Sequence, residues 1–424
     1  MKKRKIAIMG LGTVGGGAYD ILTRNRDYIK KTQGLDVEIK YILDRDCSPL
    51  EKRGIPTSLF CSSVDALAAD KEVELVIETM GGVEPAKTFI TKMLTSGKSV
   101  VTANKELLAK HWHELEPIAK AHNCGLFFEA SCVGGVPIIR ALRESFQGDK
   151  IEAVYGIING TTNYILSKMS KDGCDYASAL EEAQRLGYAE ADPTSDVEGY
   201  DAAYKLSILA SLAFHTCVPY GSIYREGISR ITARDIENAH ELGYEIKLLA
   251  IGKRNGNDIE ARVHLAFVPE EHALGSVSGA FNAVYLTGDH VGNLMFYGAG
   301  AGAAPTGSAI VSDVIKALGD KPRYCDFENN GKLDKNINLI GDFVSGYYIS
   351  ITVEDKPNVL SRISTVLGDN NISIKAATQA PGNNGTATVV FLTHRAGEKS
   401  VMRALETIGK LSSVIGIDSM IRVL

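Results

Sequence analysis

Apolar and mixed segments alternate through the first third of the chain. Short apolar runs, each the length of a strand, are separated by segments long enough to form helices. These runs cover residues 5–10, 37–43, 74–80, 99–104 and 126–131. Strands that alternate with helices pair in parallel, because each helix brings the chain back to the end of the sheet at which the previous strand began. We therefore expect an α/β fold, with a doubly wound parallel sheet in a first domain at residues 1–137.

The pattern changes in the second domain, which we place at residues 138–302. Long strands with fewer intervening helices indicate a mixed α+β domain. The predicted strands are 152–160, 246–254 and 259–269, and the predicted helices are 175–187, 200–214 and 232–246. A glycine-rich segment then leads into another helix, and we expect residues 303–330 to return to the first domain.

The last part of the chain is predicted to be a separate small domain. A polar, weakly periodic segment at residues 331–345 is the expected linker. Over residues 346–424 a strand, a helix, two strands, a helix and a strand follow one another. The two middle strands are joined by the turn-forming run Pro-Gly-Asn-Asn-Gly. This order is the βαββαβ arrangement of a compact α/β unit.

The segment 200–214 combines a helical pattern with candidate chemistry. It contains no Gly or Pro, so Asp201 and Lys205 lie on one helical face at i and i+4. The residues after Lys205 are apolar almost all round, which indicates a buried helix. A lysine at the mouth of a buried helix, one turn after a carboxylate, could transfer a proton with a tuned pKa. The alternative is an exposed ion pair in the favoured acid-then-base order, worth about 0.3–0.5 kcal/mol.

A glycine motif lies between the first strand and the helix that follows it. Gly10, Gly12 and Gly15 have the GxGxxG spacing of dinucleotide-binding, Rossmann-type folds. Gly10 allows the tight turn, Gly12 lets the backbone approach the pyrophosphate, and Gly15 lets helix and strand pack closely. Thr13 and Val14 open the helix, whose N-terminal N–H groups attract phosphate. The strand before and the helix after the motif favour a nucleotide site over a chance glycine turn.

The end of the second strand normally distinguishes NAD from NADP. Asp44 could accept a hydrogen bond from the ribose 2′-hydroxyl, whereas Arg45 could bind a 2′-phosphate. We favour NADP, with NAD as the alternative, although Arg45 and Asp46 could also be ordinary solvated turn charges. Lys105 follows another apolar run. It therefore lies beyond the carboxyl end of a predicted strand, where such sheets bind their ligands. It is a second candidate cation for the site, or else an exposed lysine at a helix start.

Charge and composition exclude several classes of protein. The net charge of -5 gives no reason to expect nucleic acid as a partner. No apolar run reaches the roughly 18 residues of a membrane span, and the basic start leads directly into a strand. The seven cysteines include no CxxC pair, which argues against a disulfide framework. We expect a cytoplasmic protein with no nucleic-acid or membrane partner.

Several blocks, taken together, resemble one family. In chain order they include GLGTVGGG, ETMGG, TANK, FEAS, NGTTNYILSKM and GAGAGAAPTGSA. The most specific block has the family signature's spacing throughout, with Ala183, Gly187-Tyr188-Ala189, Asp192-Pro193, Asp196-Val197, Gly199, Asp201 and Lys205. The whole chain resembles homoserine dehydrogenase with a C-terminal ACT domain. The resemblance implies reversible, NAD(P)H-dependent reduction of L-aspartate 4-semialdehyde to L-homoserine, on the route to threonine and methionine.

The resemblance makes residues 138–302 the catalytic, substrate-binding and dimerisation domain, and it implies roles for individual residues. Lys205 would donate a proton to the aldehyde oxygen, and Asp201 would hold the substrate and the lysine in register. Glu190 would bind the substrate through its amino group, and Asp196 would lie among the substrate-binding residues. Lys105 would border both nicotinamide and substrate. An ammonium group suits this site, because hydride addition to a carbonyl builds negative charge on its oxygen.

Two further sites are implied by the resemblance alone. Gly302, in the returning segment, would contact the cofactor. A monovalent cation, Na⁺ or K⁺, would bind the Glu129 side chain and the backbone carbonyls of Cys132, Gly134 and Val136. Such a cation prefers oxygen ligands, and it would hold the hinge between the domains. The alternative is a buried glutamate that accepts backbone N–H bonds.

The C-terminal unit resembles an ACT domain, a module that binds small effectors, often amino acids, at paired domains. Threonine is the effector that the pathway suggests. The helix entry is Asp355-Lys-Pro-Asn358, where the usual pattern has glycine in place of Asn358. Asparagine tolerates unusual turn conformations. The departure leaves two roles open, feedback inhibition or assembly of subunits into a homo-oligomer, a dimer or a tetramer.

Two other functions compete with this one. Another amino-acid dehydrogenase could share the nucleotide fold, but the segment 183–205 argues against it. A catalytically silent amino-acid sensor could hold the cofactor as a structural ligand. The sensor predicts that Lys205→Ala leaves function unchanged, whereas a dehydrogenase would lose most of its turnover.

Overall fold

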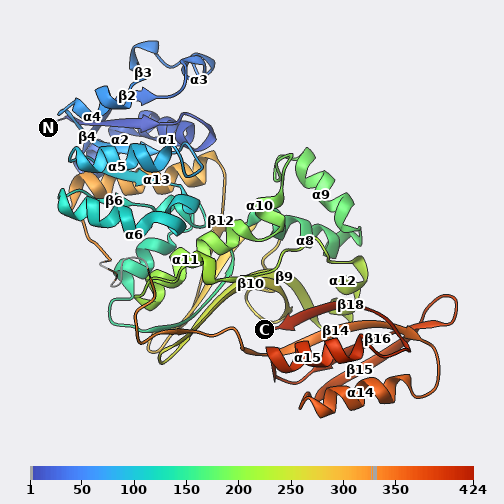
Figure 1. Cartoon of the computed structure of the whole chain (residues 1–424). Helices are drawn as coiled ribbons and strands as arrows, with labels where there is room; N and C mark the ends of the chain where they lie inside the picture. The colour runs from blue at the N-terminus through green and yellow to red at the C-terminus, as the bar shows by residue number, and fades with distance from the viewer. Residues whose placement is uncertain (1–2, 326, 328–331) are drawn as a thin grey trace.

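The computed structural model describes residues 3–325, 327 and 332–424 (Figure 1). Within these residues the strands form two sheets, one of 6 strands and one of 12. No helix among them is long and apolar enough to cross a membrane. Residues 328–331 lie outside the described part of the chain, and they include the start of the predicted linker.

The first sheet is parallel and doubly wound, as predicted. Its strand order is β3-β2-β1-β4-β5-β6. The strands are β1 (Lys3–Met9), β2 (Asp36–Leu43), β3 (Phe60–Cys61), β4 (Val73–Glu78), β5 (Ser99–Thr102) and β6 (Leu126–Phe127). The order reverses at β1, and ligands bind such sheets in the crevice at the reversal, beyond the carboxyl ends of the strands. The two-residue β3 was not predicted, because so short a strand has no hydrophobic pattern of its own.

Alternate residues of each central strand face opposite helical layers. Ile6 and Ile8 pack with α1 (Thr13–Arg24) and α13 (Ala303–Gly319). Ala7 and Met9 pack with α5 (Ala86–Thr95) and α6 (Lys105–Ala121). Both faces are therefore covered, which is why these strands are almost continuously apolar in sequence.

Helix α13 completes the first unit from far along the chain. It lies against α1, and Figure 1 shows it in orange among the blue N-terminal elements. The two helices approach closely at glycines: a Cβ on Gly17 would lie 2.0 Å from the carbonyl oxygen of Ala303. A Cβ on Gly307 would lie 2.7 Å from the carbonyl carbon of Gly17. Glycine at both positions lets the returning helix α13 dock on α1.

The middle of the chain forms an antiparallel part of the second sheet, with order β12-β11-β7-β9-β10. The strands are β7 (Ile151–Ile157), β9 (Tyr244–Asn255), β10 (Asp258–Pro269), β11 (Phe281–Gly288) and β12 (Gly292–Ala299). One face is covered by α8 (Gly160–Asp172), α11 (Tyr200–Phe214) and α12 (Ala233–Glu241). Along β9, Leu248 and Ala250 face these helices, whereas Leu249 and Ile251 face the other side.

Some of these elements differ from the sequence expectations. Strands β11 and β12 and helix α8 were not predicted as such. The helix expected over 232–246 ends at Glu241. Gly243 adopts a left-handed conformation with φ of 79°, which ends the helical path, and β9 begins at Tyr244.

The C-terminal unit has the predicted βαββαβ order. It contains β14 (Val344–Glu354), α14 (Val359–Asp369), β15 (Ile374–Pro381), β16 (Thr386–Thr393), α15 (Glu398–Ile408) and β18 (Val414–Val423). The strands lie in the order β18-β14-β16-β15. The two helices pack on one face and enclose a separate apolar core.

A junction that the sequence did not predict joins this unit to the middle sheet. Strand β18 pairs in parallel with β10 through Ala266–Arg422 and Phe267–Val423. The segment expected as a linker also takes part, since β13 (Asn338–Leu339) pairs with β10 and β14 begins at Val344. The two units therefore share one sheet (Figure 1).

Candidate functional site

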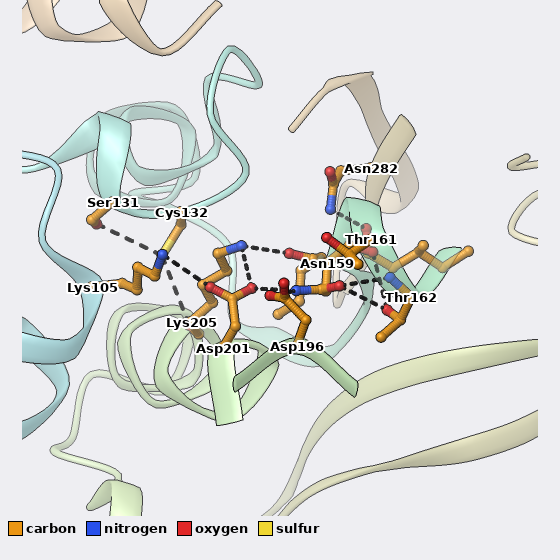
Figure 2. Close-up of polar contacts among 12 residues, drawn as sticks. Lys105, Ser131, Cys132, Asn159, Thr161, Thr162, Asp196, Asp201, Lys205 and Asn282 are labelled. Atoms are coloured by element: carbon orange, nitrogen blue, oxygen red, sulfur yellow. Dashed lines mark hydrogen bonds and ion pairs between the residues drawn. The ribbon is translucent and has the colours of Figure 1, made fainter. Parts of the chain in front are cut away.

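Three charged side chains from two units of the molecule meet at one point. Asp201 and Lys205 belong to α11, and Lys105 is the first residue of α6. The Lys205 Nζ donates to Asp201 Oδ2 at 2.6 Å, and Lys105 Nζ lies 3.2 Å from Asp201 Oδ1. Figure 2 shows the carboxylate between the two ammonium groups.

Burial decides between the two interpretations of the Asp201–Lys205 pair. Only 4% of Asp201 and 8% of Lys205 is exposed, so the pair is not a solvated surface ion pair. Burial by itself would raise the pKa of Asp201. The ammonium groups of Lys205 and Lys105 outweigh burial and hold that pKa below its ordinary value. Asp201 therefore stays an anion and holds both lysines in place.

Lys205 is further fixed by the end of a neighbouring strand. Its Nζ donates to the carbonyl oxygen of Ile158 at 2.8 Å, directly after β7. An ammonium group has three N–H donors. Two of them are taken by Ile158 and Asp201, and among the described residues no partner takes the third. The remaining donor is the one that could reach a substrate.

Asn159 organises the carboxylates, and the sequence reasoning did not assign it a role. Its Nδ2 donates to Asp196 Oδ1 at 2.7 Å and to Asp201 Oδ2 at 2.9 Å. Its Oδ1 accepts from the backbone N–H of Thr162, which caps α8. Burial and the charge of Asp201 raise the pKa of Asp196. The signal was present in the run Asn-Gly-Thr-Thr, because asparagine is a favoured helix N-cap.

Lys105 reaches the cluster from the first unit. Asn104 caps α6 two residues after the end of β5, so Lys105 lies at the carboxyl end of that strand. The negative charge of Asp201 raises the pKa of Lys105 and keeps it protonated. The side chain is 42% exposed, so it borders open space as well as Asp201.

The glycine motif has the geometry that its spacing predicts. Gly10 has φ of 91°, and a Cβ on Gly15 would lie 2.0 Å from the carbonyl oxygen of Gly10. A Cβ on Gly12 would meet nothing within 4 Å, so this side of the turn is open to a ligand. Helix α1 begins at Thr13, followed by Val14, with its N-terminus at the turn.

The candidates for ribose recognition lie beside this motif. The Asp44 carboxylate accepts a hydrogen bond from the backbone N–H of Leu11 at 2.9 Å. Asp44 therefore ties the end of β2 to the glycine turn. Arg45 is exposed and accessible to a 2′-phosphate. Gly302 is the N-cap of α13, the helix that packs on α1, with φ of 116°.

Glu190 is not in contact with the lysine cluster. It is exposed, in the loop between α9 (Tyr176–Arg185) and α10 (Thr194–Val197). The hydroxyl of Thr161 donates to the carbonyl of Tyr188 at 2.6 Å. This bond anchors the loop to the start of α8, next to Asn159.

The predicted cation site centres on a buried carboxylate. The oxygens of Glu129 accept from the backbone N–H groups of Ile139 at 2.9 Å and Arg140 at 2.7 Å. Burial, together with the nearby Asp313 carboxylate, raises the pKa of Glu129 to about 7. In the turn that follows, Gly134 has φ of 52°, and a Cβ there would lie 2.4 Å from the carbonyl oxygen of Gly300. The turn at Cys132 to Val136 thus packs against the segment that returns to the first unit.

Comparison with known proteins matches every part of this architecture. The family model for homoserine dehydrogenase matches residues 137–315, its NAD-binding domain matches residues 10–129, and the ACT domain matches residues 347–412. A homoserine dehydrogenase of Neisseria gonorrhoeae is 41% identical over 431 residues, covering 100% of this chain and 99% of that protein. The chain belongs to the homoserine dehydrogenase family. It is an NAD(P)-dependent oxidoreductase of amino-acid biosynthesis with a C-terminal ACT domain.

Solved structures agree with this assignment. A homoserine dehydrogenase from Thiobacillus denitrificans has a TM-score of 0.93 at 38% identity, covering 100% of this chain and 99% of that chain. A hyperthermophilic archaeal homoserine dehydrogenase in complex with NADPH has a TM-score of 0.64 at 29% identity, covering 75% and 98% of the two chains. Family membership favours homoserine dehydrogenase over the two competing functions, another amino-acid dehydrogenase and a catalytically silent sensor.

Proposed function

We propose that the chain reduces L-aspartate 4-semialdehyde reversibly to L-homoserine, with Lys205 as the proton donor. The observation that carries the proposal is the buried ammonium group of Lys205, held by Asp201 and Ile158 with one donor left over. When bound, NAD(P)H supplies the hydride. Lys205 Nζ then gives its proton to the aldehyde oxygen, which neutralises the charge that builds there. In the reverse direction the neutral amine accepts the proton of the hydroxyl group.

The substrate is expected to lie beside the lysine cluster. Asp201 holds substrate and Lys205 in register, Lys105 borders the same space, and Asp196 is held next to them by Asn159. The exposed carboxylate of Glu190 is available to take the substrate's amino group. This assignment gives the substrate's ammonium group an opposite charge on the protein.

The glycine turn fits a dinucleotide. The open side at Gly12 and the N-terminus of α1 at Thr13 and Val14 suit a pyrophosphate, and Gly10 and Gly15 hold the turn in shape. We assign NADP as the favoured cofactor and NAD as the alternative. Arg45 would take the 2′-phosphate, because its side chain is exposed and forms no ion pair with a described residue. The complex of the archaeal relative with NADPH supports this choice.

The Glu129 carboxylate could bind a monovalent cation, Na⁺ or K⁺, through the lone pairs that its two hydrogen bonds leave unused. Two backbone N–H groups leave capacity on both carboxylate oxygens. A buried carboxyl whose pKa is raised to about 7 would be stabilised as an anion by a nearby cation. The carbonyls of Cys132, Gly134 and Val136 would complete an oxygen donor set. The cation would then brace the turn against the returning segment.

The ACT unit is proposed to bind threonine and to take part in assembly. Asn358 adopts the left-handed conformation, with φ of 71°, at the start of α14. It can therefore form the same turn as the glycine of the usual pattern, with its backbone N–H groups available. A homo-oligomer is supported by the edge strand β12, where Met295 and Tyr297 are 39% and 53% exposed.

Steady-state kinetics with homoserine and either NADP or NAD tests this proposal directly. We expect turnover with both cofactors, a lower KM for NADP, and a lower rate when threonine is added. Replacement of K⁺ by tetramethylammonium, at constant ionic strength, tests the cation. Turnover of Lys205→Met at the wild-type rate would contradict the assignment of the proton donor.

A further inference from the structure

A cavity of about 490 Å³ lies at the junction between the middle sheet and the ACT unit. Its floor is the face of β9 and β10 that points away from α8, α11 and α12. Its rim comes from the ACT unit, at Lys375 on β15 and at Arg395 in the turn after β16. The volume is that of a small-molecule site. The cavity lies on the opposite face of the sheet from α11, which carries Lys205.

The cavity is lined by cations and not by acids. Its described lining includes Lys253, Arg262, Lys375, Arg395 and Arg422, and no Asp or Glu side chain. Arg422 is satisfied, because it pairs with Glu226 and Glu398. Glu260, whose carboxylate lies 3.0 Å from Arg262, offsets one of these charges. An excess of positive charge remains.

Two groups on the cavity floor are buried with unused hydrogen-bonding atoms. Arg262 is 3% exposed, and its Nε and Nη1 have no hydrogen-bond partner among the described residues. Its Nη1 lies 3.0 Å from a Glu260 oxygen, without hydrogen-bond geometry. His264 is 1% exposed, and its Nε2 is also without a partner. Unsatisfied buried groups of this kind cost free energy unless a ligand or water satisfies them.

Aromatic rings contact the basic side chains of the cavity floor. The Arg262 guanidinium stacks 3.6 Å from the centre of the Phe343 ring, and the ring of His264 stacks on the same phenylalanine. Lys253 lies 5.4 Å from the centre of the Tyr155 ring. Burial and the charge of Arg262 lower the pKa of Lys253. A negative charge in the cavity would relieve this repulsion.

We propose that this cavity binds a small oxyanion with two negative charges, a phosphate or a dicarboxylate, between the middle sheet and the ACT unit. Lys253 and Arg262 contact the anion on the floor, and Arg395 and Lys375 attract it at the rim. A zwitterionic amino acid fits less well, because no acidic side chain of the described lining would take its ammonium group. The site is therefore separate from the threonine site proposed at Asn358, and it does not depend on the proposed reaction.

Calorimetric titration of the full-length protein with inorganic phosphate, and separately with succinate, tests this proposal. The protein is first saturated with NADP, because the glycine turn would otherwise bind phosphate itself. One site per chain is expected for at least one of the two anions, and the preferred anion identifies the class. Lys253→Met and Arg395→Gln should each weaken binding about tenfold, the loss of one charge-assisted hydrogen bond.

Arg403→Gln is the matched control, because Arg403 is exposed on α15 of the same unit and does not line the cavity. It should bind the anion as the wild type does. Arg395 is exposed, so its replacement should leave the fold intact even if Lys253→Met is unstable. Equal binding by wild type and Arg395→Gln would overturn the proposal. So would a change of oligomeric state in Arg395→Gln without loss of anion binding, since the cations would then serve contact between subunits.

Discussion

Two helices carry the same acid-then-base pair at i and i+4, in opposite surroundings. On α11 the pair is Asp201–Lys205, with side chains 5% and 10% exposed. On α15 it is Glu406–Lys410, with side chains 69% and 72% exposed. The N–O distance is 2.6 Å in both. The spacing and the N–O distance are the same, so the surroundings are what distinguish the buried pair from the solvated one.

The difference lies in what surrounds the carboxylate. Asp201 meets a second ammonium group and an amide, and water cannot replace these partners. Glu406 has water on most sides, which screens its pair with Lys410. We call Asp201–Lys205 the inner pair and Glu406–Lys410 the outer pair. The stability of the inner pair depends on all of its partners being present, and each of its residues can be compared with the corresponding residue of the outer pair.

Removal of the lysine should give the largest contrast. Lys205→Ala is expected to lower kcat by about 10²–10⁴-fold, the usual contribution of a general acid. Lys410→Ala should leave kcat unchanged. Both are measured by nicotinamide absorbance with homoserine as substrate. NADP binding by Lys205→Ala, followed by fluorescence, should stay near that of the wild type. A similar loss of binding would mean that the variant is damaged as a whole.

Removal of the acid should lower the unfolding free energy of the protein much more for the buried pair than for the exposed pair. Asp201→Asn leaves Lys205 buried without its counter-ion, which costs about 3–5 kcal/mol of unfolding free energy in comparable pairs. Glu406→Gln should have little effect. Urea unfolding measures both. The double variant Asp201→Asn with Lys205→Met should recover part of the loss, and no recovery would argue against the buried pair as its cause.

Acid titration should show a smaller effect with a defined sign. The pKa of Asp201 lies below its value of 3.8 in an unfolded chain, so its contribution to stability is present above about pH 4. This contribution is lost as the pH falls below about 4 toward the lower pKa of Asp201 in the folded protein. Between pH 6 and pH 3 the wild type should therefore lose more unfolding free energy than Asp201→Asn. Parallel curves for the two proteins would contradict the lowered pKa.

Salt should have the smallest effect, and it should act on the outer pair alone. The screening length falls from roughly 10 Å at 0.1 M salt to about 3 Å at 1 M. Any stability difference between Lys410→Ala and wild type should vanish over this range. The difference between Lys205→Met and wild type should persist, because the inner pair is out of reach of salt. Thermal unfolding at both salt concentrations measures each difference.

Local patterns predicted the α/β sheet and the C-terminal βαββαβ order, because each rests on short segments with a clear period. The glycine turn was predictable for the same reason, since Gly10, Gly12 and Gly15 act within one turn. The buried character of α11 also followed from its apolar sequence.

Contacts between distant segments were not predictable in this way. Asn159 joins Asp196 and Asp201 only after β7 and α11 have been packed together. The position of Lys105 next to Asp201 depends on how the first unit meets the middle one. The β10–β18 pairing involves only two residues of each strand, too few to leave a pattern.

That short pairing also bears on the order in which the polypeptide can fold during synthesis. The backbone groups of residues 266 and 267 gain their β18 partners only after residues 422 and 423 have been made. Until then this part of β10 is an open strand edge, which invites pairing with other chains. A nascent chain that stops before β18 is therefore exposed to aggregation at β10, even though the segments that carry Lys105, Asp201 and Lys205 are already complete.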